Sequence, residues 1–369
     1  MNNIKAAIAR GPGQEFSVEE VQLDDPRENE VLVKISGVGI CHSDLAAKEQ
    51  HLPFPMPAVL GHEGSGIVEK VGSGVTHVAP GDHVVLSFVS CGHCGACNND
   101  LPSYCQEGFV PQNLAGMRED GSKAYHQNGE DLASHFFGQS SFGTYALASA
   151  SNTVKVRNDA PIEMLGPLGC GIQTGAGSII KAMACEPGSS LVVAGGGGVG
   201  LSAVMGGVVQ QCSTIIVVEP QEARRELALS LGATHVIDPL NTENLTEAIR
   251  AIKPEGVNYG FDTSARQDVI EGITLSLAPA GTLGLVGIPG PDQPNVSFNV
   301  MYMLSMGITV MGITEGNANP SKFIPEMVDM FMEGRFPFDK LCKTYTLDQI
   351  NEAVVDSHTG KCVKAVLIP

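Results

Sequence analysis

The chain has 369 residues, more than the roughly 250 to 300 that one hydrophobic core usually serves, so two domains are expected. Apolar residues make up 43% and charged residues 17%, as is typical of folded proteins, and the formal net charge is −18. This excess of negative charge argues against nucleic acid and anionic membranes as partners.

The N-terminal part, up to about residue 86, is predicted to form short strands separated by glycine and proline turns. Strands are expected at residues 4–9, 16–23, 30–36, 64–71 and 83–88. Many short strands at this spacing indicate a partly closed β structure. The chain starts directly in strand-like sequence without a basic and apolar leader, and no apolar run approaches the roughly 20 residues of a membrane span, so a cytoplasmic location is expected.

A cysteine-rich lobe at residues 91–105 follows, and then a long polar loop up to about residue 141. The lobe has the spacing C-x2-C-x2-C-x7-C, with thiols at Cys91, Cys94, Cys97 and Cys105. Four thiolates in a short loop form a closed tetrahedral cage, which predicts a structural zinc site, with an iron-sulfur centre as the alternative. His93 lies inside the loop and is expected to be exposed, because the thiolates already fill the coordination sphere.

From about residue 171, strands and helices alternate, which is typical of a doubly wound parallel sheet. At residues 191–201 an apolar strand ends at Ala194, and Gly195, Gly197 and Gly200 follow at the spacing G-x-G-x-x-G before a helix-compatible run at 199–211. Glycines allow a tight turn, a close approach of the backbone to a pyrophosphate and close packing of helix on strand. The order predicts a dinucleotide on the helix N-terminus.

Glu219 strengthens this interpretation. It ends a second strand, 214–218, nineteen residues beyond Gly200, where an acidic side chain accepts hydrogen bonds from an adenosine ribose. Two unit charges about 4 Å apart at an effective dielectric near 20 interact by roughly 4 kcal/mol, so the carboxylate favours NAD over NADP. Arg224 and Arg225 follow closely, either to soften this preference or simply as an exposed helix face.

The alternation continues to the end of the second domain. Helices are expected at 221–231, 244–252 and 267–277, and strands at 235–237, 258–262 and 281–287. The apolar run 301–313 is predicted to be one further strand at the edge of the sheet, and a helix at 322–332 belongs to the tail.

Three groups stand apart along the chain: Cys41, His62 and Cys170. More than a hundred residues separate His62 from Cys170, so spacing alone does not bring them together. Each of them, taken singly, also fits a buried structural position.

The whole chain nevertheless resembles the zinc-dependent medium-chain alcohol dehydrogenases. Gly61-His62-Glu63, the Pro-Gly-Asp-His-Val run at 80–84, the cysteine lobe and the glycine turn match motifs of that family in its order. The segments 135–142 and 166–175 are similar to aryl (benzyl) alcohol dehydrogenases. The same segments, with 218–220 and 313–316, are also similar to geraniol dehydrogenases.

The resemblance implies an α/β fold with a discontinuous GroES-like β-rich catalytic domain at 1–170 and 312–369 and a Rossmann doubly wound domain at 171–311. It also implies two zinc ions per subunit and NAD as cofactor. The catalytic zinc would be held by Cys41, His62 and Cys170 with one position open, with Asp44 orienting His62 and Glu63 close behind the metal. Ser43 would take the hydroxyl proton of the alcohol.

Two positions depart from animal members of the family. His42 replaces an arginine that grips the pyrophosphate; because a histidine is only partly charged near neutral pH, NADH is expected to leave faster. Ala46 replaces a histidine that ends the proton relay, so the relay ends in water unless His51, otherwise a surface residue, substitutes for it.

The remaining site residues also follow from the resemblance. Cofactor contacts are expected at His42, Thr174, Gly195, Gly197, Gly198, Val199, Gly200, Glu219, Arg224, Val286 and Ile288. An apolar substrate pocket is expected from Leu52, Phe88, Phe136 and Ile288, although any one of them also fits a core position. Burying about 100 Å² of ring or prenyl chain there is worth about 2.5 kcal/mol, which favours bulky alcohols over ethanol.

The expected activity is NAD-linked oxidation of aryl primary alcohols, with geraniol-type allylic alcohols as the alternative. A zinc-free quinone or enoyl reductase, or a nucleotide-binding protein without turnover, would lack the cysteine and histidine ligands. A homodimer or homotetramer is expected by resemblance, paired through the edge strand at 301–313.

Overall fold

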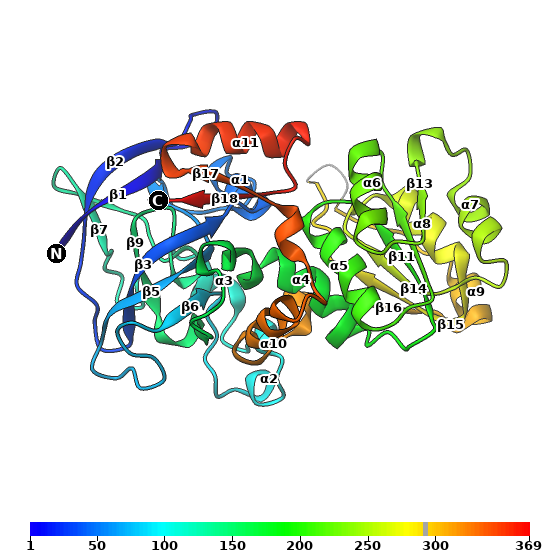
Figure 1. Cartoon of the computed structure of the whole chain (residues 1–369), viewed down its shortest axis with the longest axis horizontal. Coiled ribbons are helices and arrows are strands. Elements are labelled where there is room, and N and C mark those ends of the chain that lie inside the picture. The colour runs from blue at the N-terminus through cyan, green and yellow to red at the C-terminus, as the bar shows by residue number, and fades with distance from the viewer. Residues whose placement is uncertain (291–293) are drawn as a thin grey trace. The chain divides into compact units, whose positions relative to one another are not determined.

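The computed structural model describes residues 1–290 and 294–369. The chain divides into two compact units, shown in Figure 1. The first combines residues 1–173, 318–334 and 339–369, and the second combines 174–317 and 335–338. These limits lie a few residues beyond the expected boundaries at 170 and 311. The C-terminal return to the first unit was expected; the short excursion at 335–338 was not.

The first unit contains two sheets over one common core. One sheet has the order β4-β1-β2-β7-β8, formed by β1 (Asn2–Ala9), β2 (Ser17–Leu23), β4 (Ala58–Val59), β7 (Tyr125–Gln127) and β8 (Glu130–Leu132). The other has the order β10-β6-β5-β3-β18-β17, with β9 also paired to β3; its strands are β3 (Glu30–Gly39), β5 (Glu63–Val71), β6 (His83–Leu86), β9 (Tyr145–Ser149), β10 (Thr153–Val156), β17 (Cys342–Thr346) and β18 (Lys364–Ile368).

The C-terminal strands complete the second of these sheets. β18 lies antiparallel to β3, with Val366 opposite Gly39, so the red end of the chain lies beside a blue strand in Figure 1. Both strands are mostly buried, as their apolar sequences require. The pairing places the C-terminal segment next to the loop that leaves β3 at Cys41.

Short helices fill the connections of the first unit. They are α1 (His42–Lys48), α2 (Gly95–Asn98), α3 (Phe109–Asn113), α10 (Pro320–Met332) and α11 (Ile350–Thr359). The Asn319 side chain caps α10 and Pro320 occupies its first turn, while α11 ends at Gly360 in the left-handed conformation. α4 (Gly171–Gly177) spans the limit between the two units.

The second unit is built on a parallel sheet with the order β13-β12-β11-β14-β15-β16. Its elements are β11 (Ser190–Ala194), α5 (Gly198–Val209), β12 (Thr214–Val218), α6 (Glu222–Ser230), β13 (His235–Ile237), α7 (Leu245–Ile252), β14 (Val257–Asp262), α8 (Gln267–Ser276), β15 (Leu277–Leu285), α9 (Val300–Met306) and β16 (Thr309–Gly312). β11 is buried along its whole length, as a central parallel strand must be. The doubly wound prediction is therefore confirmed.

The prediction of a single strand over 301–313 is wrong. Its first half is α9, which the Asn299 side chain caps by accepting the N–H of Tyr302 at 3.0 Å and which ends at left-handed Gly307. Only β16 is extended, and it pairs in parallel with β15 at the sheet edge. An apolar run alone does not distinguish helix from strand, and methionine and leucine favour the helix. No described helix is both long and apolar enough to span a bilayer.

Candidate functional site

Three residues from distant parts of the first unit meet at one point. Cys41 caps α1 directly after β3, His62 precedes β5, and Cys170 follows the 3₁₀ turn Gly166–Gly169. Their two sulfur atoms and one imidazole nitrogen all lie within 4.8 Å of one another. His62 and Cys170 are buried and Cys41 is half-buried. The β3–β5 pairing brings Cys41 beside His62, and the Gly171 N–H, which donates to Glu63 at 3.1 Å, connects the Cys170 segment to the start of β5.

Asp44 organises two of the three donors. Its carboxylate is fully buried and accepts the His62 Nδ1–H at 2.9 Å, the Gly61 N–H at 3.0 Å and the Cys41 N–H at 2.9 Å. Burial lowers the pKa of His62, but the charge of Asp44 outweighs it and raises that pKa well above its ordinary value. Because Asp44 accepts the Nδ1–H, the ring is held so that Nε2 is the nitrogen available to a metal ion.

The cluster fits a metal ion by its own chemistry. Nε2 of His62 is buried and has no hydrogen-bond partner among the described residues, an arrangement that costs free energy unless a ligand uses the nitrogen. Hydrogen bonding with the Cys170 thiol lowers the pKa of Cys41 well below its ordinary value, despite burial, so this thiol is easily ionised. Two thiolates and one imidazole are a known zinc set that leaves a coordination position open.

Glu63 lies behind the cluster and outside the donor group itself. Both of its carboxylate oxygens are 2.9 Å from Nζ of Lys364, and Oε1 also accepts the Gly171 N–H at 3.1 Å. Sequence reasoning missed Lys364. The signal available was a single lysine at the head of the apolar strand Lys364–Ile368.

The predicted relay and pocket residues occupy different environments. Ser43 is in the first turn of α1, with Oγ 4.0 Å from Sγ of Cys41. His42 and His51 are exposed and Leu52 is half-buried. Phe88 and Phe136 are buried, whereas Ile288, in the second unit, is 78% exposed.

An aromatic wall stands beside His62. Phe137 stacks on the imidazole with ring centroids 4.3 Å apart, and Phe136 meets it edge-on at 5.3 Å. Phe109, which is half-buried, contacts both Phe137 at 5.4 Å and Phe88 at 5.8 Å. Sequence reasoning missed Phe109 and Phe137. Phe137 follows a predicted pocket residue directly, but nothing in the local pattern indicated Phe109.

The cysteine lobe has the geometry of a four-thiolate cage. The four Sγ atoms lie within 4.8 Å of one another, and the Sγ atoms of Cys91 and Cys97, Cys94 and Cys97, and Cys94 and Cys105 are 3.9, 3.5 and 4.0 Å apart. Bonds of about 2.3 Å in a tetrahedral zinc site require about 3.8 Å between sulfurs. His93 is exposed, as expected, and its Nε2 is 3.2 Å from the Glu107 carboxylate.

The glycine turn of the second unit connects β11 to α5. Gly195 has φ +99°, and a Cβ there would lie 2.2 Å from Oγ1 of Thr263, while a Cβ on Gly200 would lie 1.8 Å from the Gly195 carbonyl oxygen. A Cβ on Gly197 would meet nothing within 4 Å, so the backbone is open to a ligand there. Gly198 and Val199 begin α5, whose first N–H groups suit a phosphate.

Glu219 is buried against this turn. Its carboxylate accepts the Gly196 N–H at 2.6 Å and the Gln221 N–H at 2.8 Å. Arg224 and Arg225 are half-buried rather than exposed: Arg225 donates to the Glu219 and Pro220 carbonyls, and the buried Nε of Arg224 has no hydrogen-bond partner in the described part of the chain.

The two other expected cofactor contacts of the second unit make hydrogen bonds within it. Thr174 hydrogen-bonds Glu315 at 3.4 Å, and the Val286 N–H donates to the Asp262 carbonyl.

Fold and site together define an alcohol dehydrogenase of the zinc-dependent medium-chain class, and comparison with known proteins agrees. Residues 27–158 match the alcohol dehydrogenase GroES-like domain family and residues 198–333 match the zinc-binding dehydrogenase family. The chain belongs to this family, which combines a GroES-like domain with a Rossmann-like one and uses zinc and a nucleotide cofactor.

Individual relatives cover the whole chain. Geraniol dehydrogenase of Castellaniella defragrans is 47% identical over 99% of this chain and 97% of its own length. An NDMA-dependent alcohol dehydrogenase of Amycolatopsis methanolica is 34% identical over 99% and 98%. The crystal structure of benzyl alcohol dehydrogenase from Acinetobacter calcoaceticus has a TM-score of 0.95 at 43% identity and covers 100% of this chain and 99% of that one.

Proposed function

We propose that the protein oxidises bulky apolar primary alcohols to aldehydes reversibly with NAD, and that aryl alcohols of the benzyl type are its substrates. The observation that carries the proposal is the donor cluster of Cys41, His62 and Cys170 beside an aromatic wall. Zinc held by these three residues would supply Lewis acidity that favours the ionised form of an alcohol, and a dinucleotide held at the glycine turn would supply the hydride acceptor.

The residues of the chain have separate tasks in this reaction. Asp44 holds His62 in the orientation that the metal needs. Ser43, with Oγ 4.0 Å from Sγ of Cys41, accepts the hydroxyl proton of the alcohol and gives up its own hydroxyl proton. Ala46 has no group that can carry a proton. The proton that Ser43 gives up therefore goes to water, either directly or through His51, whose side chain is exposed.

The aromatic wall supports the substrate class. Phe136 and Phe137 lie against His62 and Phe109 lies against Phe137, so the three rings offer edge and face contacts to a flat, conjugated alcohol. Phe88 extends the apolar surface through its contact with Phe109, and Leu52 packs against the same hydrophobic core. A ring of about 100 Å² buried there gains about 2.5 kcal/mol, or tens of fold in specificity over ethanol.

Geraniol-type allylic alcohols are the second candidate, because a relative of 47% identity is a geraniol dehydrogenase. The negative charge of Glu219 at the end of β12 supports NAD in either case, since a 2′-phosphate placed about 4 Å away would be repelled by roughly 4 kcal/mol. Two zinc ions per chain are proposed, one for the donor cluster and one for the cysteine lobe.

A kcat/KM panel tests the proposal. Benzyl alcohol, cinnamyl alcohol, geraniol, hexanol and ethanol are compared with NAD and NADP, and elemental analysis counts the zinc. We expect benzyl and cinnamyl alcohol to exceed ethanol by at least tenfold with NAD. A clear preference for geraniol over benzyl alcohol would favour the second candidate, and equal values for ethanol would contradict both.

A further inference from the structure

A buried ion pair lies directly behind the donor cluster. Lys364 starts β18 and Glu63 starts β5, and their side chains are 6% and 0% exposed. The lysine Nζ lies 2.9 Å from each carboxylate oxygen. Ion pairs removed from water in this way are often no more stabilising than an apolar pair of the same volume, so stability alone does not account for it.

The pair is connected to the backbone beside each of the three donors. Lys364 Nζ donates to the carbonyl oxygen of Ile40 at 3.3 Å, one residue before Cys41. Glu63 itself is the residue after His62. Its Oε1 accepts the N–H of Gly171 at 3.1 Å, one residue after Cys170. One ion pair therefore joins three segments that are far apart in sequence, each at a position next to a donor.

Two glycines enclose the carboxylate. A Cβ on Gly39 would lie 2.0 Å from Oε2 of Glu63, and a Cβ on Gly171 would lie 3.1 Å from Oε1 and 3.3 Å from the lysine Nζ. The carboxylate thus has little freedom to move, and its contacts to the three segments are held in place.

The geometry points to Lys364 and Glu63 as a positioning pair that holds the backbone of Cys41, His62 and Cys170 at the spacing of a metal site, so that Lys364 controls how tightly this site retains its zinc. The inference depends on the proposed function in one respect: the cluster must be the zinc site. Partners outside the ligand set commonly change metal affinity by about 10 to 100-fold.

Zinc release to a chromophoric chelator, measured on the purified holoenzyme, tests the inference. The variants are Lys364→Met, Lys364→Arg and the double variant Glu63→Gln/Lys364→Met, which removes both charges at nearly constant volume. Lys361→Met is the matched control, because Lys361 is three residues away and 68% exposed. The rate of zinc release from the cysteine lobe serves as the internal reference in the wild type and in each variant.

We expect Lys364→Met to lose one of its two zinc ions at least tenfold faster than the wild type, with release from the lobe unchanged. Lys364→Arg and Lys361→Met keep the wild-type rate. The double variant also releases quickly, because the connections between the three segments are lost although no charge is left unpaired. If Lys364→Met does not fold, the double variant decides.

Wild-type retention by Lys364→Met or by the double variant would overturn the inference. Wild-type retention by the double variant would mean that zinc release from Lys364→Met results from the unpaired charge of Glu63 and not from lost positioning of the three segments. A wild-type protein that contains zinc in the lobe alone would overturn the proposed function, and the inference with it. Normal zinc at the cluster with unchanged release in the variants would overturn the inference alone.

Discussion

Asp44 serves three hydrogen-bond donors with two carboxylate oxygens. Oδ1 accepts from His62 and Gly61, and Oδ2 accepts from Cys41. In Asp44→Asn one oxygen becomes an NH₂ group, so at least one of these donors meets another donor in a fully buried place. We expect zinc affinity of the cluster and kcat/KM to fall by about 10 to 100-fold. Chelator competition and steady-state kinetics measure the two effects.

Asp25→Asn is the control for this substitution. Asp25 is 54% exposed and pairs with the N-terminal amine and with Lys70, remote in its contacts from the cluster. It should retain zinc and activity. Wild-type zinc affinity in Asp44→Asn would mean that the carboxylate does not orient His62.

At the residue scale, the family resemblance predicted the donors with Asp44 and Glu63, but not the aromatic and cationic residues around them. The cysteine spacing in the lobe is local, so it could be recognised without a fold. Cys41, His62 and Cys170 needed the family resemblance, because only the tertiary fold brings them together. Phe109 has no local signature, and Lys364 shows only as one lysine at the head of an apolar strand, since their contacts depend on how α3 and β18 pack.

The segment around the 3₁₀ turn Phe136–Gly138 adopts an unusual backbone. His135, Phe137, Gly138 and Ser140 all have φ between +50° and +70°. A Cβ on Gly138 would lie 2.1 Å from Cγ2 of Val89. We expect Gly138→Ala to lower the free energy of unfolding by about 2 to 4 kcal/mol, because left-handed strain and overpacking add. Denaturant titration of the purified protein measures the loss.

Gly129→Ala separates the two causes. Gly129 also has a positive φ, +83°, but a Cβ there would meet nothing within 4 Å. Gly129→Ala should therefore lower the free energy of unfolding by only about 1 to 2 kcal/mol, the cost of left-handed strain alone. Equal losses in the two variants would show that the contact with Val89 costs nothing.

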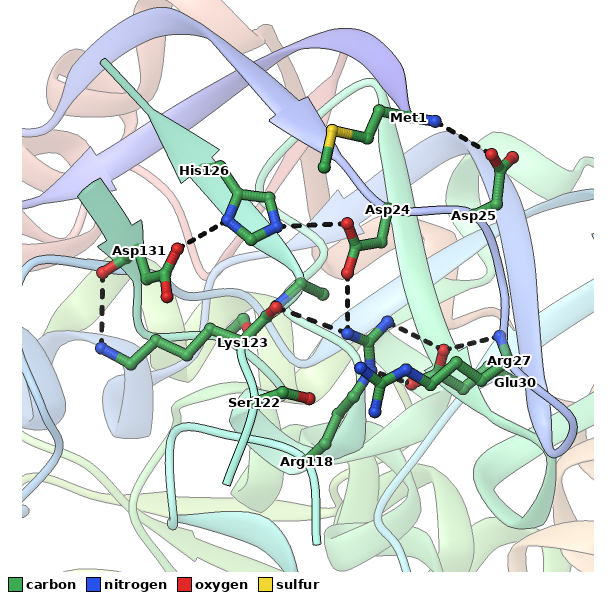
Figure 2. A network of polar contacts seen from close by, with 12 residues as sticks. Met1, Asp24, Asp25, Arg27, Glu30, Arg118, Ser122, Lys123, His126 and Asp131 are labelled. Atoms are coloured by element: carbon green, nitrogen blue, oxygen red, sulfur yellow. Dashed lines mark hydrogen bonds and ion pairs between the residues drawn. The ribbon is translucent and has the colours of Figure 1, made fainter. Parts of the chain in front are cut away.

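A polar network ties the start of β3 to the loop before the aromatic wall. Arg118 lies between Asp24 and Glu30, and His126 bridges Asp24 and Asp131, as Figure 2 shows. His135 is 3.3 Å from Glu30. Burial would raise the pKa of Glu30, but hydrogen bonds from His135 and Arg118 outweigh it and lower that pKa to about 2.

A carboxyl group whose pKa is lower in the folded protein than its unfolded value of 4.5 stabilises the fold above pH 4.5. This stabilisation is lost as the pH falls from 4.5 toward 2. The shift corresponds to about 3 kcal/mol near pH 7. We expect Glu30→Gln to be less stable than the wild type at pH 7 and this difference to shrink as the pH approaches 3. Urea unfolding at several pH values measures it. Glu130→Gln, on exposed β8, should show no such trend.

At the element scale, alternation and turn signals predicted most strands and helices within a few residues. The prediction of a polar loop up to residue 141 is wrong at the hairpin of β7 and β8, where Asn128 and Gly129 at the tip both have positive φ and form the Asn-Gly pair typical of tight hairpins. The positive φ values of His135, Phe137 and Ser140 could not be predicted, because residues other than glycine adopt them mainly under tertiary constraint.

At the scale of the whole chain, the change from short strands to alternating strands and helices predicted two domains. The parallel strand order places the glycine turn at the carboxyl end of β11, where open α/β sheets bind ligands. The return of the C-terminus to the first unit came from the family resemblance, since strand pairing between β3 and β18 leaves no trace in local sequence.

The edge of the second unit has an apolar surface that favours self-association. Val300, Met301 and Leu304 on α9 are 65%, 71% and 72% exposed, next to the edge strand β16. Exposed apolar side chains gathered on one helix commonly mark an interface, and an unpaired strand edge can extend a sheet across a twofold axis. We expect a homodimer or a homotetramer in solution.

The double variant Met301→Glu/Leu304→Glu places four new carboxylates in a twofold interface, two from each subunit, and their desolvation opposes contact. We expect light scattering after size exclusion to give half the wild-type mass, a monomer from a dimer or a dimer from a tetramer, while Val355→Glu, on a 55% exposed position of α11, keeps the wild-type mass. Because the donor cluster lies in the first unit, the double variant should retain its zinc even where catalysis declines. A double variant of unchanged mass would mean that the interface lies elsewhere. A wild-type protein that is monomeric would mean that there is no such interface.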